Sequence, residues 1–293
     1  MFRYKLTLAY DGTHYAGWQV QATGQAIQPL VQKSLTTILR HPTDLTGAGR
    51  TDAGVHALGQ TAHFDTPISC DLHRLRFALN ALLPKEIQIL DIQSVPSDFH
   101  ARYSAQSKIY HYHLQLDPVA DPFTRFYRYH VLGACDLVRM QQAIPHLLGT
   151  HDFTSFANKA FRGSASRDPI RTLARIDLIQ ETGGVHFEFE ADGFLYKMIR
   201  NLVGTLLDIG AKTIAPDEIP LILAAKDRRS AGICAPPHGL CLVQVRYGKS
   251  SINQENAKSP PSLPQDRGWG ELTQGAQPFD AALATHESYL QSR

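Results

Sequence analysis

The eleven residues from Gly47 to Ala57, GAGRTDAGVHA, combine a carboxylate, a guanidinium and three glycines with few apolar side chains. Closely spaced glycines can let backbone N–H groups hold a phosphate. However, the spacing matches neither the dinucleotide-binding motif nor the P-loop, and Asp52 would repel the anion. Alternatively, Arg50 and Asp52 form an ordinary ion pair within a turn. In a third interpretation, the small residues leave room for a ligand, and Asp52 is a nucleophile.

Hydrophobic periodicity predicts regular elements on both sides of this loop. Strands are predicted over 2–10, 60–65, 87–92, 109–116, 170–179, 185–191 and 240–247, and helices over 30–39, 72–82, 137–147, 198–207 and 219–225. Gly183 and Gly184 supply a hairpin turn between two of the strands. We expect an α+β fold of two subdomains, residues 1–105 and 106–247. Each is a mostly antiparallel sheet with helices on one face, and a cleft lies between them.

Composition narrows the class of protein. The 293 residues are 43% hydrophobic, enough for a sizeable core, and carry a net charge of only +2, so a polyanion would be bound by a local patch. No apolar run approaches the roughly 20 residues that span a bilayer, which predicts a soluble, cytoplasmic protein. The four cysteines contain no C-x-x-C pair and predict reduced thiols. Residues 248–293 are polar and proline-bearing, which predicts a disordered tail.

The stretch GRTDAGVHALGQTAHF resembles the catalytic motif of the tRNA pseudouridine synthase A family, and further stretches resemble that family in order along the chain. They are AYDGTHYAGWQVQ, LNALLPKEIQI, FHARYSAQSKIYHYHL, GTHDFTSFA, DPIRTL, ADGFLYKMIRNLVGTLLDIG and RRSAGICAPPHGLCLVQVRY. The resemblance covers about residues 2–247. The chain departs from it at 28–32, where QPLVQ replaces the family's Gln-Gly-x-Leu-Glu, and in the tail.

The resemblance implies a pseudouridine synthase fold and an isomerase that turns uridine into pseudouridine in tRNA. It assigns Asp52 as the nucleophile, Arg200 as its ion-pair partner and Tyr110 as the ring that stacks on a flipped-out uridine. An arginine beside a carboxylate favours its ionised form and can grip it bidentately. No ATP, redox cofactor or metal is implied. Whether Asp52 attacks the base or the sugar stays open.

The resemblance also implies a homodimer that modifies positions 38, 39 and 40 in the tRNA anticodon stem-loop. Candidate RNA-binding residues are Arg50, His56, Arg102, Lys108 and Arg171. Arg50 could contact phosphate or fill the place of the flipped nucleotide. The alternative function is a non-catalytic RNA-binding protein, although a central carboxylate would only repel RNA there.

Histidine is abundant in the chain, and His111 and His113 would share one face of a strand. Two histidines alone do not hold a metal, and no third ligand follows them at metal-binding spacing. The sequence therefore argues against a metal site.

Overall fold

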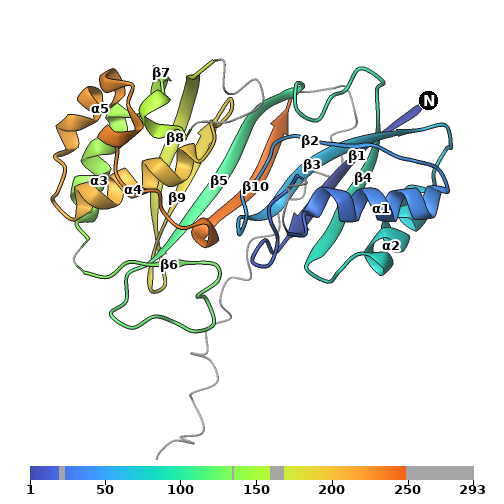
Figure 1. Ribbon diagram of the computed structural model, residues 1–293, viewed down its shortest axis with the longest axis horizontal. Helices are drawn as coiled ribbons and strands as arrows, with labels where there is room; N and C mark the ends of the chain where they lie inside the picture. The colour runs from blue at the N-terminus through green and yellow to red at the C-terminus, as the bar shows by residue number, and fades with distance from the viewer. Residues whose placement is uncertain (20–23, 134, 159–167, 249–293) are drawn as a thin grey trace, which may run out of the picture. The chain divides into compact units, whose positions relative to one another are not determined.

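A ten-stranded sheet forms the centre of the part of the chain that the structure describes (Figure 1). The structure is a computed structural model and describes residues 1–19, 24–133, 135–158 and 168–248. The strands are β1 (Phe2–Tyr10), β2 (Leu45–Gly47), β3 (His56–Thr66), β4 (Ile87–Val95), β5 (Ala105–Gln115), β6 (Tyr129–His130), β7 (Gly149–Asp152), β8 (Ile170–Glu181), β9 (Gly184–Ala191) and β10 (Leu240–Tyr247). Their order along the main path is β4-β1-β3-β10-β5-β9-β8-β7.

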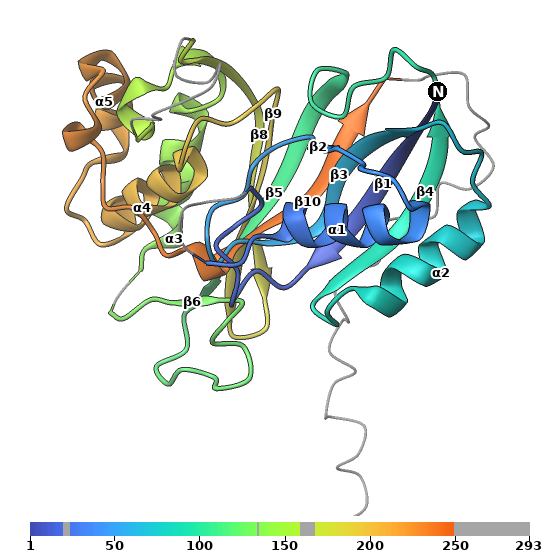
Figure 2. The same ribbon diagram turned by 45° about the vertical axis from the view of Figure 1, so that its right-hand side comes forward.

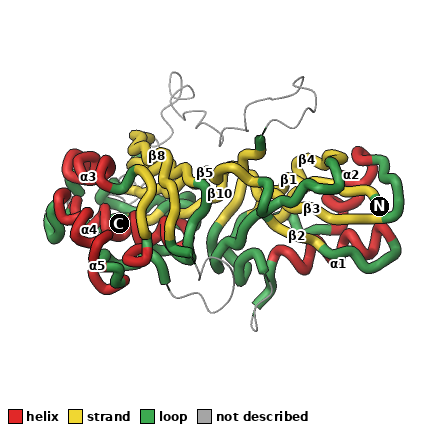
Figure 3. Tube along the Cα trace, turned by 90° about the horizontal axis from the view of Figure 1, so that it is seen from above, coloured by secondary structure: helices red, strands yellow, loops and turns green. Residues whose placement is uncertain are grey.

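The helices lie in two groups at the two ends of this sheet. They are α1 (Ile27–Leu39), α2 (Leu72–Leu82), α3 (Leu137–Ala143), α4 (Met198–Gly210) and α5 (Ile219–Ala225). Figures 1 and 2 show α1 and α2 beside β1, β3 and β4, and the other three beside β7, β8 and β9. Seen from above, β5 and β10 lie between the two groups (Figure 3). The centre of the sheet is therefore where the two groups of elements meet.

Strand β10 joins the two halves of the sheet. It pairs with β3 in parallel, at Cys241–His56 and Leu242–Ala57, and with β5 antiparallel. The backbones come so close that a Cβ on Gly59 would lie 2.2 Å from the carbonyl oxygen of Val243. Only glycine fits there without a shift of the strands.

The predicted α+β class is confirmed, since the sheet is large and mostly antiparallel and helices pack on it. β1, α2, α5 and β10 have the predicted bounds, whereas β3 is longer than the predicted 60–65. The helix predicted over 137–147 ends at Ala143 and continues as a 3₁₀ turn, because Pro145 interrupts the helical hydrogen bonds. The short strands β2, β6 and β7 were not predicted.

Residues Met1–Gly248 cluster as one unit, across which the sheet is continuous. The division into subdomains at residue 105 stays a prediction. The predicted disorder of the tail concerns residues that, after Gly248, lie outside the described part of the chain. Over the described residues, no helix is long and apolar enough to cross a membrane.

Candidate active site

The Asp52 loop, residues 48–55 between β2 and β3, is held by the segment that follows β1. Trp18 donates its backbone N–H to the carbonyl oxygen of Thr51 (3.1 Å), and Gly54 donates to that of Tyr15 (3.2 Å). The hydroxyls of Tyr10 and Thr51 lie 2.8 Å apart. Backbone and side chain thus fix the residue directly before Asp52.

Two glycines of that segment permit the close approach. Gly17 has φ +97°, and a Cβ there would lie 2.5 Å from the Thr51 carbonyl oxygen. A Cβ on Gly12 would lie 2.0 Å from the carbonyl oxygen of Val55. Both contacts are shorter than any side-chain carbon allows, so glycine at these positions lets the Asp52 loop sit against the end of β1.

Arg200 reaches Asp52 from the first turn of α4. Its Nη1 donates to Oδ2 of Asp52 at 3.0 Å, and its Nε donates to the carbonyl oxygen of Ala235 at 2.7 Å. The side chains are 11% and 22% exposed, so the pair is largely shielded from solvent. The expected bidentate grip is not observed, because the guanidinium divides its donors between two acceptors. Among the described residues, Oδ1 of Asp52 has no hydrogen-bond partner.

Tyr110 lies on β5, the strand next to β10 in the sheet. Its side chain is buried, and its ring meets that of Phe194 edge-on with 5.2 Å between centroids. Burial raises the pKa of the Tyr110 hydroxyl, and the nearby groups Tyr10 and Asp52 raise it further. Tyr110 is therefore a neutral phenol whose hydroxyl lies within the electrostatic reach of Asp52. The structure thus brings together the three side chains expected in the catalytic site.

Three of the expected RNA-binding cations form a group beside the Asp52 loop. Burial and the charges of Arg102 and Arg171 lower the pKa of Lys108 to about 8, and Asp192 partly offsets this effect. A Cβ on Gly49 would lie 3.4 Å from the Lys108 ammonium nitrogen. Like charges near enough to lower the pKa of Lys108 favour a bound anion.

The other two expected RNA-binding residues differ from this group. Arg50 is exposed on the Asp52 loop. His56 is buried, its Nδ1 accepts a hydrogen bond from the Gly12 N–H (3.1 Å), and its Nε2 lies 2.9 Å from the Phe126 carbonyl oxygen. Burial lowers the His56 pKa, which fits a neutral ring with the proton on Nε2. Its role in RNA binding stays a prediction, and the contacts indicate a residue that positions the loop.

Sequence reasoning missed two participants. The Ala235 carbonyl oxygen orients Arg200, and Phe194 packs on Tyr110. Every residue has a backbone carbonyl group, so the residue type of Ala235 could not indicate that its carbonyl oxygen accepts a hydrogen bond from Arg200. Phe194 stands six residues before Arg200 in a stretch that the resemblance covers, and this was the available signal.

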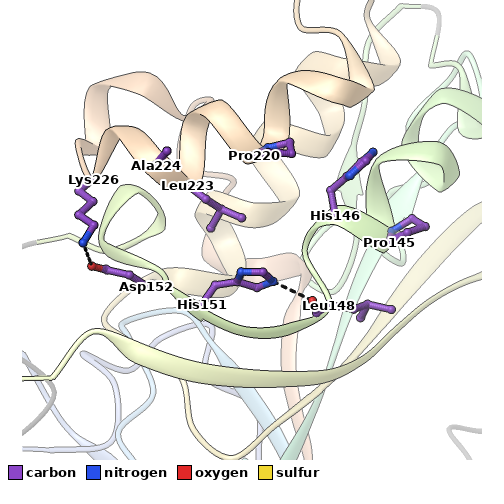
Figure 4. A pocket seen from close by; sticks show the side chains of 9 residues that line it. All are labelled: Pro145, His146, Leu148, His151, Asp152, Pro220, Leu223, Ala224 and Lys226. Carbon is purple, nitrogen blue, oxygen red and sulfur yellow. Dashed lines mark hydrogen bonds and ion pairs between the residues drawn. The ribbon is translucent and has the colours of Figure 1, made fainter.

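A hollow of about 520 Å³ lies elsewhere, between α5 and the segment before β7 (Figure 4). None of the expected site residues lines it. Lys226 pairs with Asp152 at 2.9 Å, and His151 bonds the Leu148 carbonyl oxygen at 2.8 Å. Because these polar groups are already paired with each other or with backbone, the hollow does not compete with the Asp52 site.

The arrangement suits nucleophilic catalysis by a carboxylate. A fixed arginine holds one oxygen of Asp52, the other oxygen has no partner among the described residues, and the buried ring of Tyr110 lies within electrostatic reach of the carboxylate. In the described part of the chain, the groups of His, Cys, Asp or Glu that could hold a metal do not include Asp52.

Comparisons with known proteins point to one family. A family model described as tRNA pseudouridine synthase matches residues 7–104 and 143–248. A tRNA pseudouridine synthase A 1 from Protochlamydia amoebophila (strain UWE25) is 51% identical over 248 residues, which cover 84% of this chain and 97% of that protein. Enzymes named tRNA pseudouridine synthase A from Exiguobacterium sp. (strain ATCC BAA-1283 / AT1b) and Streptococcus pneumoniae serotype 19F (strain G54) are 44% and 45% identical. They cover 85% and 84% of this chain, and 99% of each relative is matched.

Proposed function

This chain belongs to the tRNA pseudouridine synthase family, and from this premise we propose that it isomerises uridine to pseudouridine in tRNA. The observation that carries the proposal is the contact between Asp52 and Arg200. These residues stand 148 positions apart in the chain, on opposite sides of the β3–β10–β5 seam, yet their side chains meet at 3.0 Å. An ion pair that serves only stability needs no available carboxylate oxygen and no aromatic ring beside it.

We propose that Asp52 is the nucleophile. Its free oxygen forms a transient bond with the target nucleotide, the bond between N1 and the sugar breaks, and the uracil turns and rejoins the sugar through C5. The proton that leaves C5 is balanced by the one that N1 gains, so the product is an isomer of the substrate. Arg200 orients the carboxylate through the contact between Nη1 and Oδ2.

Tyr110 supplies the surface on which the flipped-out uracil stacks. Extruding a base costs a few kcal/mol, and stacking on an aromatic ring returns about 1–3 kcal/mol. The phenol packs against Phe194, and burial raises its pKa above an ordinary value that already leaves it neutral. A neutral ring at this position accepts a uracil without adding charge beside Asp52.

Lys108, Arg102 and Arg171 bind the RNA backbone next to the target nucleotide. Their mutual repulsion in the free protein is relieved when a phosphate lies between them. Following the resemblance, the substrate is the anticodon stem-loop at positions 38, 39 and 40, and the enzyme acts as a cytoplasmic homodimer.

One substitution distinguishes the proposed isomerase from the alternative function, RNA binding without catalysis. Asp52→Asn preserves shape and removes the nucleophile, so we expect pseudouridine formation on an unmodified tRNA transcript to fall below about one thousandth, with tRNA affinity retained. Asp44→Asn, an exposed aspartate near the loop, is the matched control and should keep full activity. Mapping of the product tests the positions, and full turnover by Asp52→Asn would refute the assignment.

A further inference from the structure

A cluster of histidines and glutamates lies on the face of the sheet opposite to Tyr110. His111 follows Tyr110 on β5, and successive strand residues point to opposite faces. His186 and Glu188 on β9 lie on the same face, since β5 and β9 pair side by side. We propose that His111, His186 and Glu188 form a binding site for a divalent transition metal, Zn²⁺, that links the two strands.

Two of the three donor pairs already stand near tetrahedral spacing. Nε2 of His111 lies 3.2 Å from Oε1 of Glu188, and Nε2 of His186 lies 3.6 Å from the same oxygen. Zinc bonds of about 2.0–2.1 Å place neighbouring ligands of a tetrahedron about 3.3 Å apart. All three donors lie within 4.8 Å of one another, so a zinc ion fits with small adjustments of side chains.

A second layer of contacts orients the ligands. Nδ1 of His186 lies 3.2 Å from Oε2 of Glu181, as in the carboxylate–histidine–zinc arrangement that turns the other nitrogen toward a metal. Oε2 of Glu188 accepts a hydrogen bond from Arg175 at 2.8 Å, which leaves Oε1 for the ion. Arg175 also bonds Asp177, so its charge does not neutralise Glu188 alone.

Carboxylates face both ring nitrogens of His186, Glu181 at Nδ1 and Glu188 at Nε2. The 3.6 Å between Nε2 of His186 and Oε1 of Glu188 is too long for a strong hydrogen bond, so an ion between these two atoms replaces a weak contact with two coordinate bonds.

The fold also removes the sequence argument against a metal. That argument was the lack of a third ligand near His111 and His113 along the chain. Strand pairing supplies the missing ligands from 75 and 77 residues away, where residue spacing carries no signal. Of the two overlapping donor groups, we choose the one with Glu188. In the other, the Glu181 carboxylate is shared by His113, His186 and Arg128.

The test is zinc titration of the tag-free, chelator-treated full chain by calorimetry, with Co²⁺ absorption as a second readout. We expect one ion per chain with nitrogen and oxygen ligation and a higher melting temperature with zinc. Glu181→Gln, which changes only the second layer, should weaken binding about 10–100-fold. His111→Gln should weaken it at least as much, and His146→Asn, an exposed histidine outside the cluster, should not change it.

Absence of zinc binding to the parent protein would overturn the proposal, as would binding of unchanged affinity in His111→Gln. Circular dichroism of each variant shows whether it folds. If His111→Gln does not fold, His186→Asn gives the same comparison. Because no tRNA is present, the result is independent of the proposed isomerase activity.

Discussion

At the residue scale, Arg200 is distinctive because its donors serve a carboxylate and a backbone carbonyl at once. Lysine keeps the charge but has no planar fork, so Arg200→Lys cannot satisfy Asp52 and Ala235 together. We expect kcat to fall about 10²–10³-fold, as when one electrostatic donor is removed from other active sites. Single-turnover pseudouridine formation with saturating enzyme measures this effect.

Arg139 on α3 offers a matched control for Arg200. Its guanidinium also bonds two backbone carbonyl oxygens, those of Ile209 and Ile214, but it has no place in the Asp52 site. Arg139→Lys should lower the melting temperature and leave kcat unchanged. Equal losses of kcat in both variants would show that Arg200 acts through stability alone.

Lys108 gives a prediction about pH. With a pKa of about 8, the free protein carries this charge on about nine molecules in ten at pH 7 and about one in ten at pH 9. Phosphate binding favours the charged form, so tRNA affinity should fall as pH rises through 8. Lys108→Met should remove this dependence and lower the slope of log affinity against log salt by about one.

Filter binding at several salt concentrations and pH values measures the Lys108 effect. Lys85→Met, an exposed lysine in the turn before β4, is the control. If both variants change affinity and slope equally, the lysine beside the Asp52 loop has no special contact with RNA.

The residue types of the site were predictable, but their contacts were only partly so. Asp52, Tyr110 and Arg200 each match a motif of the resembled family, and the sequence named them. Tyr110, Tyr112, Leu114 and Leu116 share one face of the predicted strand, so alternation alone indicates an ordinary core residue at Tyr110. The division of Arg200 between two acceptors depends on the Ala235 backbone, which residue type does not encode.

At the element scale, the Asp52 loop depends on a turn that only glycine allows. Gly17→Ala adds both an unfavourable φ of +97° and a clash with the Thr51 carbonyl oxygen. We expect the free energy of unfolding to fall by roughly 1–3 kcal/mol and kcat to fall as well, because the loop is displaced. Denaturant unfolding and steady-state kinetics measure the two effects.

Substitution of Gly133 tests the effect of an unfavourable φ without a steric clash, and so serves as the control for Gly17→Ala. It has φ +96°, but no heavy atom of the described residues lies within 4 Å of a Cβ there. Gly133→Ala should therefore cost roughly 1 kcal/mol of stability and leave kcat intact. Loss of kcat in Gly133→Ala would mean that general destabilisation explains the Gly17 result.

Elements with strong periodicity were predictable because one face of each is buried. In β1, Tyr4, Leu6, Leu8 and Tyr10 are buried in strict alternation, and the predicted bounds are those observed. The strands β2 and β7 have three and four residues. They form because a longer neighbour offers free backbone groups, so their own residues show no pattern.

At the scale of the whole molecule, the site forms because β10 joins the two halves of the chain into one sheet. Asp52 belongs to the first half and Arg200 to the second, and β10 pairs with both β3 and β5. The sequence predicted a separate sheet in each half. The parallel pairing of β3 with β10 joins strands almost 200 residues apart and consists of two residue pairs. Its one sign in the sequence is Gly59, a glycine that the close approach of β10 requires. The sheet is continuous across the site, and the cleft between subdomains stays a prediction.

We expect residues 249–293 to be dispensable for stability, catalysis and tRNA binding. The curated relatives match over 248–250 residues, which are 97–99% of their own length, and the match to the family model ends at residue 248. Residues 249–293 hold four basic and five acidic side chains, a net charge of −1 that does not attract RNA. A chain that ends at Gly248 should keep the melting temperature, kcat and the salt dependence of tRNA binding. Calorimetry, product mapping and filter binding on both lengths test this, and a weaker salt dependence in the short chain would show that the tail contacts RNA despite its charge.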